Sequence, residues 1–138
     1  GAHLPGVKFY AIYFSASWCA PCRTVTPGLV DIYGRLRELY PECELVLVNR
    51  DRSPQEMAAY MSEERIQWPA LNYDAIRLAA EINGYAGPGI PCLVLVNENG
   101  RVLSDTYRKG TYVGPKVVIE DMWQILRDYR RQNPRRQN

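Results

Sequence analysis

Two cysteines separated by two residues, Cys19 and Cys22, are the side chains of this sequence best suited to redox chemistry. They lie between an apolar run at residues 7–14, with the length and composition of a buried strand, and the start of a long helical pattern. A cysteine at the start of a helix faces unpaired backbone N–H groups and the positive end of the helix dipole, which both favour the thiolate. We therefore expect the pKa of Cys19 to lie below the free-cysteine value of about 8.5.

The second cysteine is placed to react with the first. Cys22 lies one helical turn after Cys19 and on the same face, within reach for a disulfide bond. Pro21, in the first turn, removes a donor that would have no helical partner and stiffens the loop. The spacing predicts a pair in which one thiol attacks, a mixed disulfide forms and the other thiol resolves it.

Two other interpretations of the Cys-x-x-Cys pattern can be weighed against redox chemistry. A structural zinc site needs further ligands, and the remaining candidates, Cys43, Cys92 and His3, are isolated in the sequence. A purely structural disulfide would close a very short loop and remove little chain entropy. Because the pattern follows a strand and opens a helix, it favours a redox pair. We expect no metal and no cofactor beyond the redox-active disulfide itself.

The composition indicates one globular domain. The chain has 138 residues, of which 46% are hydrophobic and 23% charged, and these values are ordinary for this class of protein. We predict a domain at residues 1–132 and a disordered basic tail at residues 133–138, which lack an apolar anchor. No run approaches the length of about 18 apolar residues that a membrane span requires. We expect a monomer.

Positive charge is concentrated at the C-terminal end. Residues 127–138 hold five arginines and one aspartate, so the other residues, with 12 basic and 14 acidic side chains, carry a net charge of −2. Basic side chains favour the negative end of a helix, and no aromatic platform for bases interleaves with these arginines. We expect a solvated helix end and no nucleic-acid binding.

The cellular compartment stays open on the sequence. Four cysteines, two of them in the motif, are too few for a secreted scaffold held together by disulfides. No signal peptide is visible. The chain starts only a few residues before its first predicted strand, which suggests a trimmed mature protein or an excised domain. Both a cytoplasmic and an exported protein fit these observations.

Regular alternation of apolar and turn-forming segments predicts the elements around the cysteines. Apolar runs predict strands at residues 7–14, 44–49, 92–96 and 101–106. Helical periodicity predicts helices at residues 20–40, 54–64 and 74–83 and from about residue 115 onwards. The dipeptide Asn99-Gly100 predicts that the last strand returns antiparallel, and a further turn is expected around Lys109-Gly110. This order predicts an α/β fold, a central mixed β-sheet with helices on both faces.

Two helices carry local signals of their own. Ser53 followed by Pro54 and then Glu56 is a capping-box pattern, which places a helix start at this point. Pro27 falls inside the first predicted helix, where it removes a hydrogen bond and should bend the axis. The alternative is that the helix breaks there, because proline more often ends a helix than kinks it.

Taken together, these features resemble the thioredoxin superfamily, and within it the tryparedoxin and nucleoredoxin branch. The similarity lies in residues 13–27 (YFSASWCAPCRTVTP), 68–71 (WPAL) and 89–91 (GIP). It spans roughly residues 7–126 and is most specific around the cysteines. The resemblance implies a thioredoxin-like fold.

The resemblance also implies roles for individual residues. Cys19 would be the attacking thiolate and Cys22 the resolving thiol. Pro91 would be a cis-proline that packs against the disulfide. Trp18 would shield one side of the site and contact substrate; the alternative is a plain core aromatic, since tryptophan is usually well buried.

The remaining substrate contacts implied by the family lie on both sides of the disulfide. Ala20 and Pro21, between the cysteines, would contact substrate, and the main chain of Ile90 would pair with an extended substrate as a strand does. Several positions depart from the usual pattern, among them Pro69 and Asn72 in the tryptophan-containing segment, and two others bear directly on the redox chemistry. Tyr13 stands where a buried acid is common, so no side chain can be identified from the sequence as the proton acceptor for Cys22. Cys92, where threonine is common, is either an inert strand residue or a third redox thiol.

The favoured function is a thiol-disulfide oxidoreductase. Its partners would be disulfide-containing protein substrates and a protein or small-thiol reductant. One alternative is a dedicated exported redox partner of the cytochrome-maturation type. Another is a non-catalytic adaptor that uses the fold for binding, against which the intact cysteine motif argues.

Overall fold

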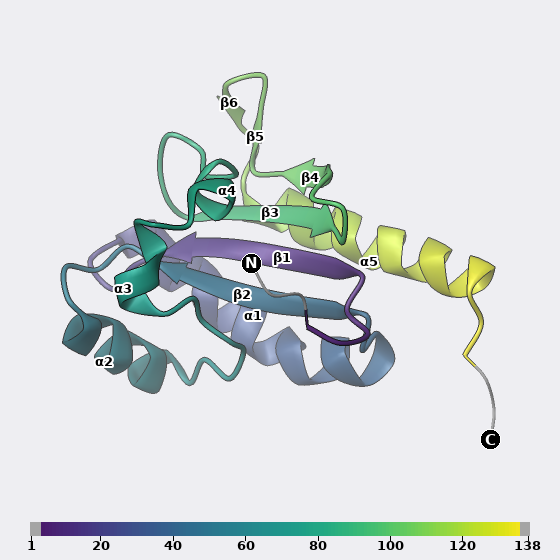
Figure 1. The fold of residues 1–138 in the computed structure, drawn as a ribbon, viewed down its shortest axis with the longest axis horizontal. Helices are drawn as coiled ribbons and strands as arrows, with labels where there is room; N and C mark the ends of the chain where they lie inside the picture. Colours follow the sequence, from purple (N-terminus) through teal and green to yellow (C-terminus); the bar gives the residue numbers. More distant parts are fainter. Residues whose placement is uncertain (1–3, 136–138) are drawn as a thin grey trace.

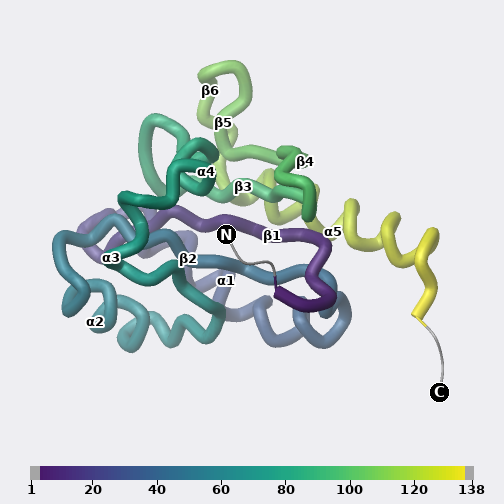
Figure 2. The backbone as a smooth tube through the Cα atoms, in the orientation of Figure 1, coloured from purple at the N-terminus to yellow at the C-terminus, as the bar shows by residue number. Residues whose placement is uncertain are grey.

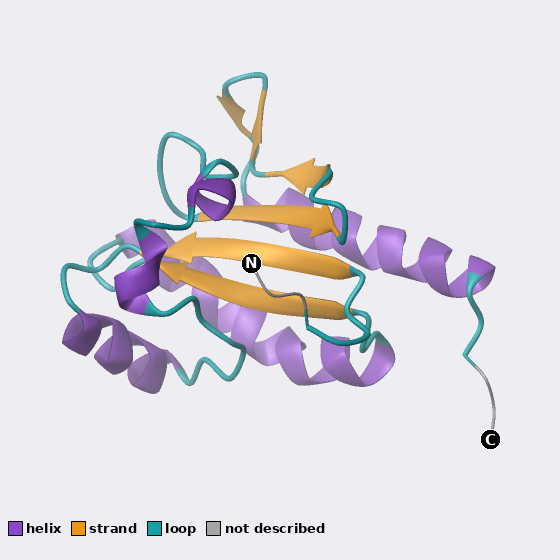
Figure 3. Cartoon of the chain, viewed as in Figure 1, coloured by secondary structure: helices purple, strands orange, loops and turns teal. Residues whose placement is uncertain are grey.

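The computed structural model describes residues 4–135 (Figure 1). The helices are α1 (Ala20–Leu39), α2 (Pro54–Glu64), α3 (Tyr73–Ile76), α4 (Ala80–Asn83) and α5 (Pro115–Gln132). The strands are β1 (Phe9–Ser15), β2 (Cys43–Asn49), β3 (Cys92–Asn97), β4 (Val102–Asp105), β5 (Tyr107–Arg108) and β6 (Thr111–Tyr112). Figure 3 shows these elements by type.

One mixed sheet organises the chain. Its strand order is β2-β1-β3-β4, with β5 and β6 forming a separate hairpin. β1 pairs with β2 in parallel, from Phe9 opposite Cys43 to Ser15 opposite Asn49, and pairs with β3 antiparallel. The parallel pair requires a crossover, which α1 provides. The predicted α/β class with a central mixed sheet is confirmed.

Helices cover both faces of this sheet because β1 and β3 are apolar on both sides. Ala11 and Tyr13 of β1 pack in one cluster with residues of α1, α2 and α5. Ile12 and Phe14 face the other way, into a cluster that includes residues of α3 and α4. In Figure 1, α1 and α5 accordingly lie behind the sheet and α3 and α4 in front of it. Alternation along one central strand thus builds both layers.

The local helix signals hold in the structure. Ser53 caps the start of α2, where its hydroxyl accepts a hydrogen bond from the Glu56 N–H at 3.1 Å. The Glu56 carboxylate accepts the Arg52 N–H, also at 3.1 Å. α1 continues without interruption through Pro27, so the alternative of a break at this proline is wrong.

The helix predicted at residues 74–83 is instead two single turns, α3 and α4. Ala79 leaves the helical conformation, with φ −90° and ψ 72°. The Asn83 side chain donates to the Ile76 carbonyl at 2.7 Å and so bonds the end of one turn to the other. Only Ile76 is buried in these two helices. Short helices gain most of their stability from a packed apolar face, and this segment lacks one long enough for a continuous helix.

The two predicted reversals are confirmed. β4 returns antiparallel to β3. In the turn between these two strands, Gly100 has a positive φ of 83°, a conformation that glycine adopts readily. β5 and β6 form the second hairpin around Lys109 and Gly110, which both have positive φ.

The C-terminal helix ends where the Asn133 N–H donates to the Tyr129 carbonyl at 2.8 Å. Of the tail predicted at residues 133–138, residues 136–138 lie outside the described part of the chain, and the domain boundary at residue 132 stays a prediction. Within residues 4–135, no helix combines the length and the apolar character that crossing a membrane requires.

Candidate active site

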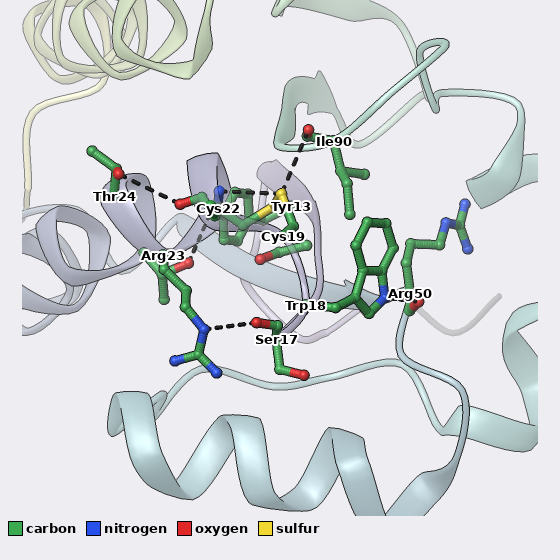
Figure 4. The surroundings of a disulfide bond; sticks show 12 residues. Tyr13, Ser17, Trp18, Cys19, Cys22, Arg23, Thr24, Arg50 and Ile90 are labelled. Atoms are coloured by element: carbon green, nitrogen blue, oxygen red, sulfur yellow. Dashed lines mark hydrogen bonds between the residues drawn. A yellow bond between two sulfur atoms is a disulfide. The ribbon is translucent and has the colours of Figure 1, made fainter.

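A disulfide joins Cys19 and Cys22 where β1 gives way to α1 (Figure 4), with 5.2 Å between the two Cα atoms. Cys19 is the residue before the first turn of α1, in extended conformation. The Cys22 N–H donates to the Cys19 sulfur at 3.2 Å. This is the bond that the sequence anticipated, because an unpaired N–H at a helix start stabilises negative charge on the sulfur it faces.

The two cysteines differ slightly in their exposure to solvent. Cys19 is 5% exposed, whereas Cys22 is fully buried. Ala20 and Pro21, between them, are exposed. We therefore expect a partner molecule to reach Cys19 before Cys22. The predicted substrate contacts of Ala20 and Pro21 stay predictions.

The loop before β3, which is distant in sequence from the cysteines, lies against the disulfide. The peptide bond between Ile90 and Pro91 is cis, as the family resemblance implied. Pro91 is buried and Ile90 half-buried. The Ile90 carbonyl oxygen lies 3.7 Å from the Cys19 sulfur. The structure thus brings Ile90, Pro91 and the cysteine pair together; a main-chain pairing of Ile90 with substrate stays a prediction.

Trp18 lies on the surface beside Cys19. It is 57% exposed, so the alternative of a core aromatic is wrong. Its indole Nε1–H donates to the Arg50 carbonyl at 3.0 Å, which anchors the ring to the loop after β2. The guanidinium of Arg50 in turn lies 5.1 Å from the centre of the Phe14 ring. Figure 4 shows Trp18 on the opposite side of Cys19 from Thr24.

A buried carboxylate that the sequence analysis missed holds the segment before the cysteines. Asp51 accepts hydrogen bonds from the Ser17 N–H at 3.1 Å and from the Ser17 hydroxyl at 2.6 Å. The Ser17 carbonyl accepts the Arg23 Nε–H at 2.6 Å. The available signal was the position of Asp51 just after a buried parallel strand, at the same edge of the sheet as the cysteines.

Buried hydroxyl groups lie in place of the acid found in many thioredoxins. Tyr13 is fully buried, and its hydroxyl shares a hydrogen bond of 2.8 Å with the Thr26 hydroxyl. Thr26 bonds in turn to the Tyr60 hydroxyl at 2.7 Å, and Tyr60 bonds to Ser15. Burial raises the pKa of Tyr13 well above its usual value. Tyr13 therefore stays protonated at neutral pH and is no replacement for a carboxylate base.

The other two cysteines are both buried and unpaired. Burial raises the pKa of Cys43 to about 12. Burial also raises the pKa of Cys92, at the start of β3. Raised pKa values leave little thiolate, which fits the inert interpretation of Cys92 better than a third redox thiol. Across residues 4–135 the structure holds no group of three or more His, Cys, Asp or Glu side chains able to bind a metal; His3 lies outside that range.

The chain is similar in sequence and in structure to proteins that are already known. A family model described as thioredoxin-like matches residues 6–102. Nucleoredoxin of Xenopus laevis is 37% identical over 98 residues, which cover 70% of this chain and 23% of that protein. Tryparedoxin of Trypanosoma brucei brucei is 32% identical over 118 residues, which cover 83% of this chain and 74% of that protein. A solved structure of tryparedoxin II complexed with glutathionylspermidine matches with a TM-score of 0.64 and 25% identity, over 92% of this chain and 78% of that one.

The share of the relative's length that this chain covers differs between the two kinds of relative. It spans 23% of the length of the frog nucleoredoxin, but 74% of the trypanosome tryparedoxin. The matched residues include β1, the cysteine pair and the loop that ends in Pro91.

Proposed function

The chain belongs to the thioredoxin-like family, and on this premise we propose that it is a thiol-disulfide oxidoreductase that reduces disulfide bonds in protein partners. The observation that carries the proposal is the unequal exposure of the two cysteines, since Cys19 keeps 5% of its surface accessible to solvent and Cys22 keeps none. Such a pair has one sulfur for the partner and one for resolution. An adaptor that only binds would need neither.

The reaction begins with the reduced pair. The Cys19 thiolate attacks one sulfur of the substrate disulfide, forms a mixed disulfide and expels the other substrate sulfur as a thiolate, which takes up a proton. The Cys22 thiol then loses its proton and attacks the Cys19 sulfur. The second substrate sulfur leaves as a thiolate and is protonated. The substrate has gained two electrons and two protons, and Cys19 and Cys22 are again joined.

The environment of the pair supports this assignment of roles. The Cys22 N–H that donates to the Cys19 sulfur would stabilise the attacking thiolate. The same contact keeps the two residues one helical turn apart, at a separation that suits a disulfide. Because Tyr13 stays protonated, we propose that water receives the proton of Cys22.

One dithiol, or two molecules of a monothiol in succession, must return the pair to its reduced state. We propose a protein or small-thiol reductant, which attacks Cys19 by the same exchange in reverse. Support comes from the relative that was solved with glutathionylspermidine, a small molecule bound to a protein of the same family. The narrow exposure of Cys19 fits both kinds of donor.

Reduction of insulin disulfides, with dithiothreitol as the electron source, tests the proposal. The protein should speed the precipitation of the insulin B chain well beyond the rate with dithiothreitol alone. A Cys22→Ser variant should give no turnover but should accumulate mixed disulfides through Cys19. A rate equal to that of the reductant alone would reject the enzyme and favour an adaptor. Capture of one cellular protein by Cys22→Ser, with no activity on insulin, would favour a dedicated partner.

A further inference from the structure

We infer that Asp51 is a positioning residue: acting through Ser17, it holds Trp18 in place beside Cys19 for the binding of protein substrates. The inference rests on the proposed function and extends it to a residue without contact to the reacting sulfurs. It starts from a charged group in an unusual place, since Asp51 is only 6% exposed.

The Asp51 carboxylate is bound by neutral donors. Its two oxygens lie 3.1 and 3.2 Å from the Ser17 nitrogen and both accept the N–H of that residue. The carboxylate also accepts hydrogen bonds from the Ser17 hydroxyl at 2.6 Å and from the Asn49 side-chain amide at 2.7 Å. A buried charge is stable only when hydrogen bonds replace its lost hydration. Hydrogen bonds to a charged acceptor are stronger than those between neutral groups, and three of them link this carboxylate to Ser17, so it fixes the position of Ser17.

Ser17 is fixed from a second side as well. Its carbonyl accepts the Arg23 Nε–H at 2.6 Å, and Arg23 lies in the first turns of α1. Both peptide units of Ser17 are therefore bonded, one to the loop after β2 and one to the helix that carries Cys22. Ser17 precedes Trp18 directly, so the backbone of Trp18 is held through its neighbour.

The loop that carries Asp51 also holds the ring of Trp18. The Arg50 carbonyl accepts the indole Nε1–H at 3.0 Å, and the Arg50 N–H donates to the Ser15 carbonyl at 2.9 Å. The Tyr73 hydroxyl donates to the Asp51 carbonyl at 2.8 Å and supports the loop from α3. Trp18 is thus held at its backbone and at its ring by one loop, although most of its surface is exposed.

An exposed aromatic ring that is already held in place loses little conformational entropy when a partner covers it. This benefit applies to a protein substrate large enough to contact Trp18 as well as Cys19. A small alkylating reagent needs the Cys19 sulfur alone. The hydrogen bond that the Cys19 sulfur accepts comes from Cys22, not from Asp51. Removing Asp51 should therefore separate activity on proteins from reactivity toward small reagents.

The first test compares Asp51→Asn and Ser17→Ala with the control Asp74→Asn. Asp74 is an exposed carboxylate on the neighbouring α3, and its loss removes the same charge. We expect kcat/KM for insulin to fall about tenfold in Asp51→Asn, as loss of a charge-assisted hydrogen bond produces, mainly through KM. Ser17→Ala should lose less, because its N–H remains. Alkylation of reduced Cys19 by iodoacetamide should change by less than about twofold in all three variants.

A double-mutant cycle with Trp18→Ala tests the route of the effect. If Asp51 acts through Trp18, Asp51→Asn should change kcat/KM by less than about twofold once Trp18→Ala is present. A full tenfold loss in that background would overturn the inference. So would Asp51→Asn and Ser17→Ala proteins with the kcat/KM of the parent protein.

A readout without turnover separates this inference from the proposed function. The Trp18 indole N–H gives a cross-peak in a ¹H–¹⁵N spectrum, assigned by its loss in Trp18→Phe. We expect this peak to shift and its hydrogen exchange to speed up in Asp51→Asn and Ser17→Ala, while the peaks of Trp68 and Trp123 stay in place. An unchanged Trp18 peak would overturn the positioning role even in an active enzyme. A parent protein without activity on insulin would reject the proposed function, and the peak would still decide whether Asp51 holds Trp18.

Discussion

The two ends of the parallel pair β1 and β2 each place cysteine at the edge of the sheet, with opposite results. At the carboxyl end, Cys19 begins a helix, receives a backbone N–H on its sulfur and keeps 5% of its surface exposed. At the amino end, Cys43 pairs in the ladder with Phe9, is fully buried and has its pKa raised to about 12. The same side chain is therefore reactive or inert according to the backbone groups and solvent around it.

The amino end is built for stability. There Arg130, near the end of α5, forms two hydrogen bonds of 2.8 Å with the Glu42 carboxylate and one of 3.1 Å with the Leu39 carbonyl. In Figure 2 this end of α5 lies at the opposite side of the molecule from the carboxyl ends of β1 and β2. We therefore expect that each end can be altered with little effect on the other.

The largest difference is expected from removing each cysteine in turn. Cys19→Ser should lower insulin reduction by roughly 1000-fold or more, because a serine hydroxyl cannot form the mixed disulfide. Cys43→Ala, the matched change at the other end, should keep the activity of the parent protein. Steady-state rates under identical reducing conditions give the comparison. A large loss in Cys43→Ala with an intact fold would mean that the amino end takes part in the chemistry.

Alkylation should rank the thiols of the reduced protein. At pH 7 a thiol with a pKa of about 12 is thiolate in only about one molecule in 100,000, whereas Cys19 is expected to ionise below about 8.5. Between pH 6 and pH 9, labelling of Cys19 by iodoacetamide should rise with pH and then level off. Cys43 should label at least about 100-fold more slowly. Mass spectrometry of timed samples measures this, and Cys22 labelling ahead of Cys19 would contradict the assignment of the nucleophile.

Stability should respond at the amino end without a matching change in activity. Arg130→Ala should lower the free energy of unfolding by roughly 2 kcal/mol, because it removes hydrogen bonds to a largely buried carboxylate. Arg131→Ala is the control, since Arg131 pairs with Asp128 on the exposed surface of the same helix, and it should cost less than about 0.5 kcal/mol. Urea unfolding of the oxidised proteins measures both. Equal losses in the two variants would show that the contact with Glu42 contributes nothing.

The smallest effect is expected from the basic C-terminal end. Deleting residues 133–138 should leave insulin reduction unchanged, because α5 ends at the opposite side of the molecule from the carboxyl end of β1, after which the cysteine pair follows. The parent protein at equal concentration is the control. A clear loss of activity would give the tail a role in binding substrate or reductant.

Much of this site was visible in the sequence because its signals are local. The cysteine spacing, the apolar run before it and the helical periodicity after it lie within one continuous stretch, residues 7–40, and each has its own physical meaning. The cis bond before Pro91 came from the family resemblance alone, since the local sequence does not decide between cis and trans.

Two features escaped prediction for different physical reasons. Asp51 bonds to a residue 34 positions away, and no periodicity or turn signal reports a contact that forms only when two strands pair. The segment of α3 and α4 has residues that favour helices, but whether a helix continues depends on the face it buries. In both cases tertiary contacts decide the outcome.

The burial of Cys22 has a consequence for the order of events during turnover. Both the substrate and the reductant would react at Cys19, the one cysteine of the pair that keeps any exposed surface, so under the proposed chemistry the two cannot occupy the enzyme together. Each must depart before the other binds, and the protein carries the electrons between them. Kinetics of the ping-pong type follow: double-reciprocal plots at several reductant concentrations should be parallel, and an unreactive analogue of either partner should inhibit competitively against that partner and uncompetitively against the other.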